Sequence, residues 1–212
     1  MMRRFPVYLL IDTSGSMTGE PIESVKVGLE AKLSSLRGDP FALESANISI
    51  ITYDREVKVI LPLTPLEDIQ IPEITCPESG PTNMGAALKT LCKQMDSEVN
   101  LSTPTQKGDW MPLLFLMTDG KPSDIMEYNE AIPEVKKRKF ATIVACAAGS
   151  KAKTEPLQQL TRFILLTPWT RARLASSSNG CQAPSGWETA VSVQQATFFF
   201  LRRQRRLITY YN

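Results

Sequence analysis

Three long apolar runs dominate the hydrophobic pattern of the chain. They cover residues 6–12, 112–120 and 140–149, and the first two reach the carboxylates Asp12 and Asp119. Unbroken apolar runs of this length are typical of strands that are buried on both faces of a parallel sheet. We therefore predict three buried strands, two of which end at an acidic side chain.

Between these runs, apolar side chains recur at the spacing of an amphipathic helix. After the first run, Val25, Leu29, Leu33 and Leu36 share one helical face, and Pro21 suits the first turn. Further helices are predicted over residues 84–95, over Glu127–Lys139 with Pro133 as a local defect, and from residues 155–161.

Two shorter segments of β-branched residues follow the first predicted helix. Residues 46–54 and 56–63 are joined so closely that they must form an antiparallel hairpin. Residues 64–83 are rich in Pro, Thr and Ser and are expected to form a long loop. The alternation of strands and helices predicts a doubly wound α/β sheet, mainly parallel, with one antiparallel edge strand and helices on both faces.

Composition narrows the classes of function. The 212 residues are 42% hydrophobic and 22% charged, which fits a globular domain, and the net charge of +2 gives no indication of a nucleic-acid partner. The chain has no histidine, so Ser-His-Asp and Cys-His catalytic sites are excluded, and a bound metal should be a hard cation held by oxygens. The cysteines Cys76, Cys92, Cys146 and Cys181 lack a metal-site or disulfide spacing and are predicted to be reduced.

The N-terminus superficially resembles a signal peptide because two arginines precede an apolar stretch. That stretch is short and ends at Asp12 without a small-residue cleavage site, so we interpret it as the first strand. No segment approaches the length of a transmembrane helix. A cytoplasmic location without a membrane span is therefore expected.

Candidate metal ligands follow the predicted strands. Asp12 ends the first strand, and Ser14 and Ser16 follow in a turn in which Gly15 allows close backbone approach. Thr82 precedes a helix, and Asp119 ends another strand. Because ligands bind beyond the carboxyl ends of strands in open α/β sheets, these oxygens should meet at one edge. Such a set suits Mg²⁺, with Mn²⁺ or Ca²⁺ as competitors.

Each of these pieces also has a structural explanation that needs no metal. The segment from Asp12 to Ser16 can shape a turn and cap a helix, Thr82 can be an N-cap, and Asp119-Gly120 can be an ordinary turn. The five residues favour a metal site through their joint order and their positions on these elements.

Asp12-Thr13-Ser14-Gly15-Ser16 resembles the D-x-S-x-S signature of von Willebrand factor A (VWA) domains, whose fold is Rossmann-like. Thr82 and Asp119 are similar to the remaining parts of that family's metal-ion-dependent adhesion site (MIDAS). The resemblance covers residues 5–165 and implies that Asp12, Ser14, Ser16 and Thr82 bind the metal directly or through water. It implies that Asp119 acts through water or a hydrogen bond, and that a partner's Asp or Glu takes the open coordination position.

Longer stretches resemble the TerY-like proteins of bacterial tellurite-resistance clusters. These stretches include FPVYLLIDTSGSMTGEPIESVKVGL, SGPTNMGAAL and PLLFLMTDGKPSD. The resemblance implies an adaptor in a stress-response system that works with kinase and phosphatase proteins. No residue set indicates tellurite reduction or direct tellurite binding.

The chain changes character after about Arg162, so we predict a VWA domain over residues 1–165 and an atypical basic segment over residues 166–212. The segment carries six arginines and one acid, Glu188, and it is interpreted either as a basic tail or as the frameshifted end of the same domain. Codons for residues 166–170 and 177–181 can be chosen so that a shifted frame reads Asp-Thr-Met-Asp and Phe-Lys-Trp-Val. Both strings resemble the end of TerY-like domains.

A binding module without enzymatic activity is the leading interpretation. The first alternative is a metal-dependent phosphatase or hydrolase that uses the same ion, with Asp54 and Asp124 as extra carboxylates. Nucleotide binding is disfavoured because SGPTNMG lacks the P-loop lysine. A chelatase-type VWA subunit shares the metal site, but the chain carries no ATPase segment or acidic linker.

Overall fold

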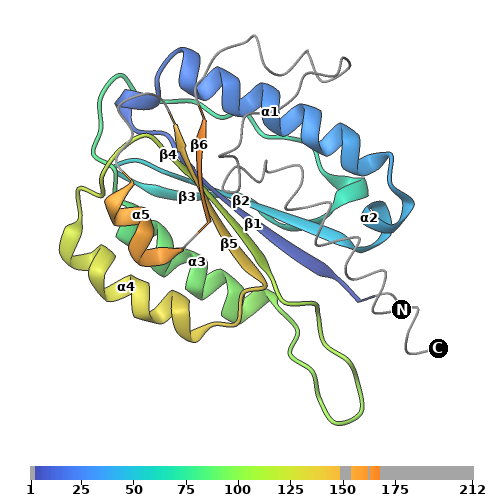
Figure 1. Cartoon of the computed structure of the whole chain (residues 1–212). Helices are drawn as coiled ribbons and strands as arrows, with labels where there is room; N and C mark the ends of the chain where they lie inside the picture. Colours follow the sequence, from blue (N-terminus) through green and yellow to red (C-terminus); the bar gives the residue numbers. More distant parts are fainter. Residues whose placement is uncertain (1–2, 149–153, 162, 168–212) are drawn as a thin grey trace, which may run out of the picture.

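The computed structural model describes residues 3–148, 154–161 and 163–167 (Figure 1). The strands are β1 (Phe5–Asp12), β2 (Ala46–Tyr53), β3 (Val57–Pro65), β4 (Leu113–Thr118), β5 (Thr142–Ala148) and β6 (Phe163–Thr167). The helices are α1 (Glu20–Arg37), α2 (Pro40–Ser45), α3 (Met84–Glu98), α4 (Ile125–Lys137) and α5 (Glu155–Leu160). Two short 3₁₀ helices are η1 (Gly15–Met17) and η2 (Leu66–Asp68).

The strands form one sheet in the order β3-β2-β1-β4-β5-β6. All neighbouring pairs are parallel except β2 and β3, which form an antiparallel hairpin with β3 at the edge. The predicted doubly wound α/β sheet with one antiparallel edge strand is therefore confirmed. The register of β1 on β4 pairs Ile11 with Met117, so Asp12 lies beside Thr118 where the two strands end.

Helices cover both faces of the sheet, with α1 and α2 on one face and α3, α4 and α5 on the other (Figure 1). Side chains of β1 alternate between the two resulting cores because successive strand residues point to opposite faces. Val7, Leu9 and Ile11 belong to the first core, and Tyr8 and Leu10 belong to the second. This double burial explains the unbroken apolar run that predicted the strand.

Helix α4 begins at Ile125 and ends at Lys137, two residues earlier at each end than predicted. It continues through Pro133, whose exposed ring lies on the outer face. Its inner face contributes Ala131, Ile132 and Val135 to the core. This burial compensates for the hydrogen bond that proline cannot donate.

The segment after β3, which was predicted as a long loop, packs against the core. It contains η2 and buries Leu66, Ile69 and Ile74 against the face that carries α1. The short helix α2 was not predicted; the Asp39 carboxylate caps it by accepting hydrogen bonds from two backbone amides of its first turn. Both features cover the α1 side of the sheet.

Strand β6 extends across the predicted boundary between residues 165 and 166. The predicted basic segment beyond Thr167, including Cys181, lies outside the described residues. Cys76, Cys92 and Cys146 are free thiols. None of the helices among the described residues is long and apolar enough to cross a membrane.

Candidate metal centre

Asp12 is the innermost residue of the site. It ends the central strand β1 and its side chain is fully buried. Its Oδ1 accepts a hydrogen bond of 2.9 Å from the Ser14 backbone amide, and its Oδ2 accepts one of 2.6 Å from Thr118 Oγ1. The carboxylate is therefore held from both sides, by its own loop and by the end of β4.

Ser14 and Ser16 lie on the turn that follows β1. Their hydroxyl oxygens are 3.2 Å apart, and Ser16 Oγ donates a hydrogen bond of 2.9 Å to Asp119 Oδ1. This contact joins two loops that are 103 residues apart in sequence. Ser14 is buried and Ser16 is exposed, so the oxygens lead from the interior of the domain to its surface.

Gly15 explains how the turn packs. A Cβ atom at this position would lie 2.8 Å from Ser79 Cα and 2.9 Å from the Glu78 carbonyl oxygen. Only glycine admits the backbone of residues 78–79 at that distance, because even a methyl group would overlap with it. The loop that leads to Thr82 is therefore packed directly on the serine turn.

Thr82 completes the cluster from the segment that precedes α3. Its Oγ1 lies 3.8 Å from the position that a Cβ atom on Gly120 would occupy, next to Asp119. Ser123 holds the Thr82 backbone with two hydrogen bonds: its amide donates to the Thr82 carbonyl (2.8 Å), and its Oγ accepts from the Thr82 amide (2.9 Å). The structure thus brings all five predicted residues to one edge of the sheet.

The spacing of the oxygens fits a six-coordinate Mg²⁺ site. With metal–oxygen bonds of 2.0–2.1 Å, neighbouring ligands of an octahedron lie about 2.9 Å apart. The hydroxyl oxygens of Ser14 and Ser16, two neighbouring candidate ligands, lie 3.2 Å apart, which is close to that spacing. The donor set is hydroxyl and carboxylate oxygen throughout, which is the set that hard cations prefer.

Electrostatics at the site favours a cation. Burial raises the pKa of Asp12 to about 6, although hydrogen bonds from Ser14 and Thr118 lower it, and the nearby Asp119 raises it further. No lysine or arginine among the described residues forms an ion pair with Asp12 or Asp119. At neutral pH a buried negative charge is therefore left without a protein counter-charge.

The two further carboxylates considered in the sequence have structural roles. Asp54 Oδ1 accepts a hydrogen bond from the Glu56 amide (2.9 Å), and Oδ2 accepts one from Thr13 Oγ1 (3.1 Å). Asp124 accepts hydrogen bonds from the Gly85 and Ala86 amides and so caps α3. Within the described part of the chain, no group of three or more His, Cys, Asp or Glu side chains is placed to hold a metal.

Cys76 lies beside the site, in the wall of an open cavity of about 570 Å³ that also includes Thr13, Asp54 and Ser79. Burial raises the pKa of this thiol to about 11, and the negative charge of Asp12 adds to the effect. In the metal-free protein the thiol is therefore protonated at neutral pH and is a poor nucleophile.

Three contributors to the site did not stand out in the sequence: Thr118, Ser123 and Asp124. Thr118 was recognisable only as the residue before Asp119, and Asp124 was considered only as an extra carboxylate of a phosphatase or hydrolase site. Their hydrogen bonds span 106, 41 and 38–39 residues, so they depend on the packing of distant segments. Only Thr118 had a local signal, as a polar residue next to a predicted ligand.

Residues 7–165 match the family model described as von Willebrand factor type A domain. The chain is similar to solved structures of a von Willebrand factor type A protein from Catenulispora acidiphila (TM-score 0.60, 15% identity, covering 78% of this chain and 38% of that one) and of proximal thread matrix protein 1 from the mussel byssus (0.57, 16%, 79% and 44%). A further structure of the mussel protein, described as having a zinc-occupied MIDAS motif, gives a TM-score of 0.55 at 18% identity, covering 78% and 44%.

The chain spans less than half the length of these solved structures. At 15–18% identity the likeness shows the fold alone. The chain matches no curated protein sequence.

Proposed function

We propose, on the premise that this chain belongs to the von Willebrand factor type A domain family, that it is a metal-dependent protein-binding module. Asp12, Ser14, Ser16, Thr82 and Asp119 would hold one Mg²⁺. The observation that carries the proposal is the meeting of three distant loops: a 2.9 Å hydrogen bond from Ser16 to Asp119 joins two of them, and the loop before Thr82 packs on Gly15. When bound, the cation supplies a positive charge with a coordination position for a partner's Asp or Glu.

The proposed ligands differ in burial and charge, and their roles differ accordingly. Asp12 provides a buried negative charge whose orientation is fixed by Ser14 and Thr118. The three hydroxyl groups are neutral donors that add no charge. Asp119 is held by Ser16, so it contributes through a hydrogen bond or water. With so few anionic ligands, a divalent ion keeps positive character toward an incoming carboxylate.

The donor set supports Mg²⁺, with Mn²⁺ or Ca²⁺ as competitors, over a softer metal. The mussel protein holds zinc in its own MIDAS motif. In this chain the proposed ligands are all oxygens, and histidine is absent. Zinc prefers nitrogen and sulfur ligands, which this site lacks.

We infer a binding rather than an enzymatic role. A two-metal phosphatase or hydrolase needs additional carboxylates near the ion. The two candidates, Asp54 and Asp124, use their oxygens to bind backbone amides and the Thr13 hydroxyl. A chelatase-type role would use the same metal site and is supported by nothing further in this chain.

The resemblance of long stretches to TerY-like proteins supports a more specific role. We propose that the protein is a cytoplasmic adaptor in a bacterial tellurite-resistance or stress-response system. Its partners would include a kinase or a phosphatase that presents an acidic side chain to the metal.

The proposal is tested by a pull-down: the immobilised protein is incubated with a lysate of the cells whose genome encodes it, in Mg²⁺ and in excess EDTA. The retained proteins are then identified. The wild type is compared with Asp12→Ala and with Asp68→Ala, which removes an exposed carboxylate elsewhere. We expect partners that are retained only in Mg²⁺, by the wild type and Asp68→Ala. Equal retention in EDTA, or by Asp12→Ala, would contradict the proposal. Calorimetry with the recovered partner then measures the metal dependence directly.

A further inference from the structure

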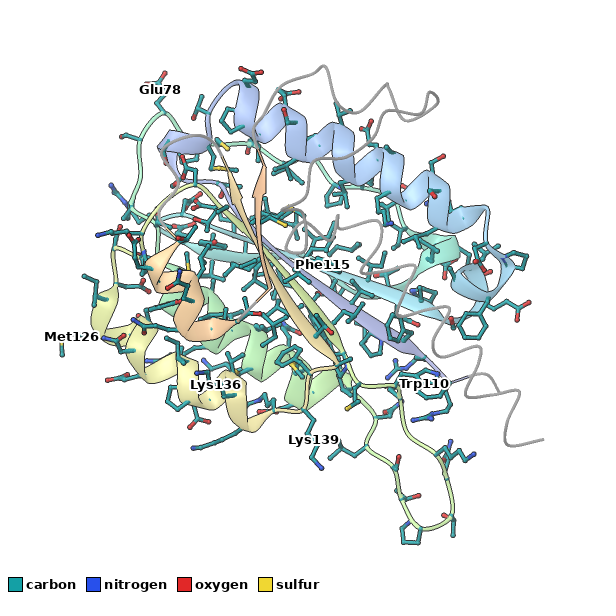
Figure 2. All side chains as sticks on the ribbon, in the orientation of Figure 1. Glu78, Trp110, Phe115, Met126, Lys136 and Lys139 are labelled. Carbon is teal, nitrogen blue, oxygen red and sulfur yellow. The ribbon has the colours of Figure 1, made fainter. Side chains whose placement is uncertain are left out.

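Two adjacent apolar side chains are exposed at the end of the sheet that carries the metal centre. Ile125 and Met126 form the first turn of α4, and 62% and 82% of their surfaces are accessible. Met126 points outward at the same end of the sheet as Glu78 (Figure 2). We call this pair the Ile–Met patch. The other large exposed hydrophobics of the described residues are isolated: Val27, Leu101 and Met111.

The fold gives no reason for apolar side chains at these two positions. They contribute nothing to the core, which α4 reaches through Tyr128, Ala131, Ile132 and Val135. Acidic or small polar residues are favoured in a first helical turn because they complement the helix dipole. Exposed, adjacent apolar residues beside a polar site are typical of a protein interface.

The patch is fixed relative to the metal centre by the residues that precede it. Ser123 makes two hydrogen bonds to the backbone of Thr82, and Asp124 caps the first turn of α3. Gly85 allows the start of α4 to pack tightly on α3, since a Cβ there would lie 2.3 Å from the Tyr128 nitrogen. The Ile–Met patch is therefore rigidly attached to the loop that presents Thr82.

The distance from the metal centre to the patch is limited by the chain. Met126 is three residues after Ser123, which itself contacts Thr82, so the chain keeps the two anchors within roughly 15 Å of each other. An extended peptide advances about 3.3 Å per residue and covers that distance in three to five residues. A single partner segment can therefore reach both.

We propose that the Ile–Met patch is the second anchor of the surface whose first anchor is the metal centre. The partner is a protein segment with an Asp or Glu for the metal and an apolar side chain three to five residues away. A carboxylate–metal contact is available to any exposed acid, so an apolar contact at a fixed distance supplies the selectivity that the metal lacks. This inference rests on the proposed function.

The test uses synthetic peptides and the full chain in saturating Mg²⁺. One peptide carries a single Glu and a Leu four residues later in an otherwise Gly/Ser sequence. Matched peptides replace the Leu by Ser, place it one residue from the Glu, or replace the Glu by Gln. Binding is followed by methyl NMR of labelled Ile and Met side chains. The Met126 signal is assigned from Met126→Gln, and Met111 is an internal control at the other end of the sheet.

We expect the Glu and Leu peptide to shift the Met126 methyl signal but not that of Met111. It should bind at least five-fold more tightly than the Ser-substituted and one-residue peptides. Met126→Gln should remove this advantage, and Leu101→Gln, which changes an equally exposed residue elsewhere, should keep it. Equal, Mg²⁺-dependent binding of all Glu peptides with an unmoved Met126 signal overturns this inference alone. Binding that needs neither Mg²⁺ nor the Glu overturns the proposed function and this inference with it.

Discussion

The two ends of the sheet carry polar clusters of different composition, although β1 contributes to both. At the end away from the metal centre, Arg4 forms a 2.6 Å ion pair with Asp109 and donates to the Glu98 carbonyl. The Glu98 carboxylate accepts hydrogen bonds from the Tyr8 hydroxyl and the Leu63 amide. Each acid of this cluster therefore has donors within the protein. Trp110 marks this end and Glu78 the other (Figure 2).

At the metal end, Asp12 and Asp119 receive hydrogen bonds from two hydroxyl groups and one amide. No cationic side chain of the described residues pairs with either of them. The first cluster contains a cation of the protein, Arg4, which pairs with Asp109, and we call it the balanced cluster. The cluster at the other end has no such protein cation among the described residues, and this contrast supports the proposed metal site.

Removing one acid at each end should separate the two roles. Asp12→Asn should weaken Mg²⁺ binding by at least about 100-fold, on the order of 3 kcal/mol, because it removes the central charged ligand. Asp109→Asn should leave Mg²⁺ affinity within about two-fold. It should lower the free energy of unfolding by about 1–3 kcal/mol, a value reduced by the partial exposure of Arg4.

Calorimetric titration with Mg²⁺ and urea unfolding of both variants provide the measurements. Loss of Mg²⁺ binding in Asp109→Asn without loss of stability would contradict the division between the two ends. Retained affinity in Asp12→Asn would remove Asp12 from the site.

The pH dependence of stability should also distinguish the metal end. Burial raises the pKa of Asp12 from 3.8 to about 6, so the folded metal-free protein binds a proton in a range where the unfolded chain does not. The free energy of unfolding should therefore rise as the pH falls from about 7 to 4, by up to about 3 kcal/mol. With Mg²⁺ present the trend should reverse, because metal binding requires the deprotonated carboxylate.

Urea unfolding at several pH values, with and without Mg²⁺, tests this prediction. The reference is Asp12→Asn, since other acids that titrate in the same range remain in that variant. Identical pH profiles for the metal-free wild type and Asp12→Asn would show that the buried carboxyl is not the cause.

The parts of the fold that the sequence predicted are those with a strong local pattern. The run Phe5–Asp12 is apolar because both faces of β1 are buried, and the short link after Tyr53 leaves only a hairpin. The segment after β3 escaped prediction because Leu66, Ile69 and Ile74 reach the core from an irregular backbone.

Prediction of the candidate site from the sequence was likewise limited to residues with a local pattern. Four of the five proposed ligands could be named because they lie at or just after the end of a strand, and Thr82 because it precedes a helix and is similar to part of the family's site. Asp124 could not be understood in this way, because its position before α4 suggests a cap of its own helix while its carboxylate caps α3. Such roles are set by the packing of two helices, which no local pattern reports.

Gly15→Ala should damage the metal end without removing any ligand or charge. The added methyl group would meet the backbone of residues 78–79 at 2.8–2.9 Å, so the serine turn or the loop before Thr82 must move. We expect a loss of about 1–3 kcal/mol in the free energy of unfolding and a roughly ten-fold weaker Mg²⁺ affinity. The control is Gly28→Ala in α1, where a Cβ meets nothing within 4 Å and should stabilise the helix by about 0.5–1 kcal/mol. Unchanged Mg²⁺ affinity in Gly15→Ala would show that the packing of the two loops does not position the ligands.

Ser123→Ala is the smallest change that can still distinguish the two ends. Its hydroxyl accepts the hydrogen bond from the Thr82 amide, so its loss leaves that partly buried donor without a partner and frees Thr82 to move. We expect Mg²⁺ affinity to fall about five- to ten-fold, near 1 kcal/mol, measured by calorimetry. Ser123→Thr, which keeps the hydroxyl, should restore most of this affinity.

The control variant is Ser97→Ala, which removes an exposed hydroxyl of α3 at the balanced end and should not change Mg²⁺ affinity. Equal losses of Mg²⁺ affinity in Ser97→Ala and Ser123→Ala would mean that the hydrogen bond from Thr82 to Ser123 does not specifically position the ligand. A loss of Mg²⁺ affinity in Ser123→Ala alone would show that the metal site depends on a residue that is not itself a ligand.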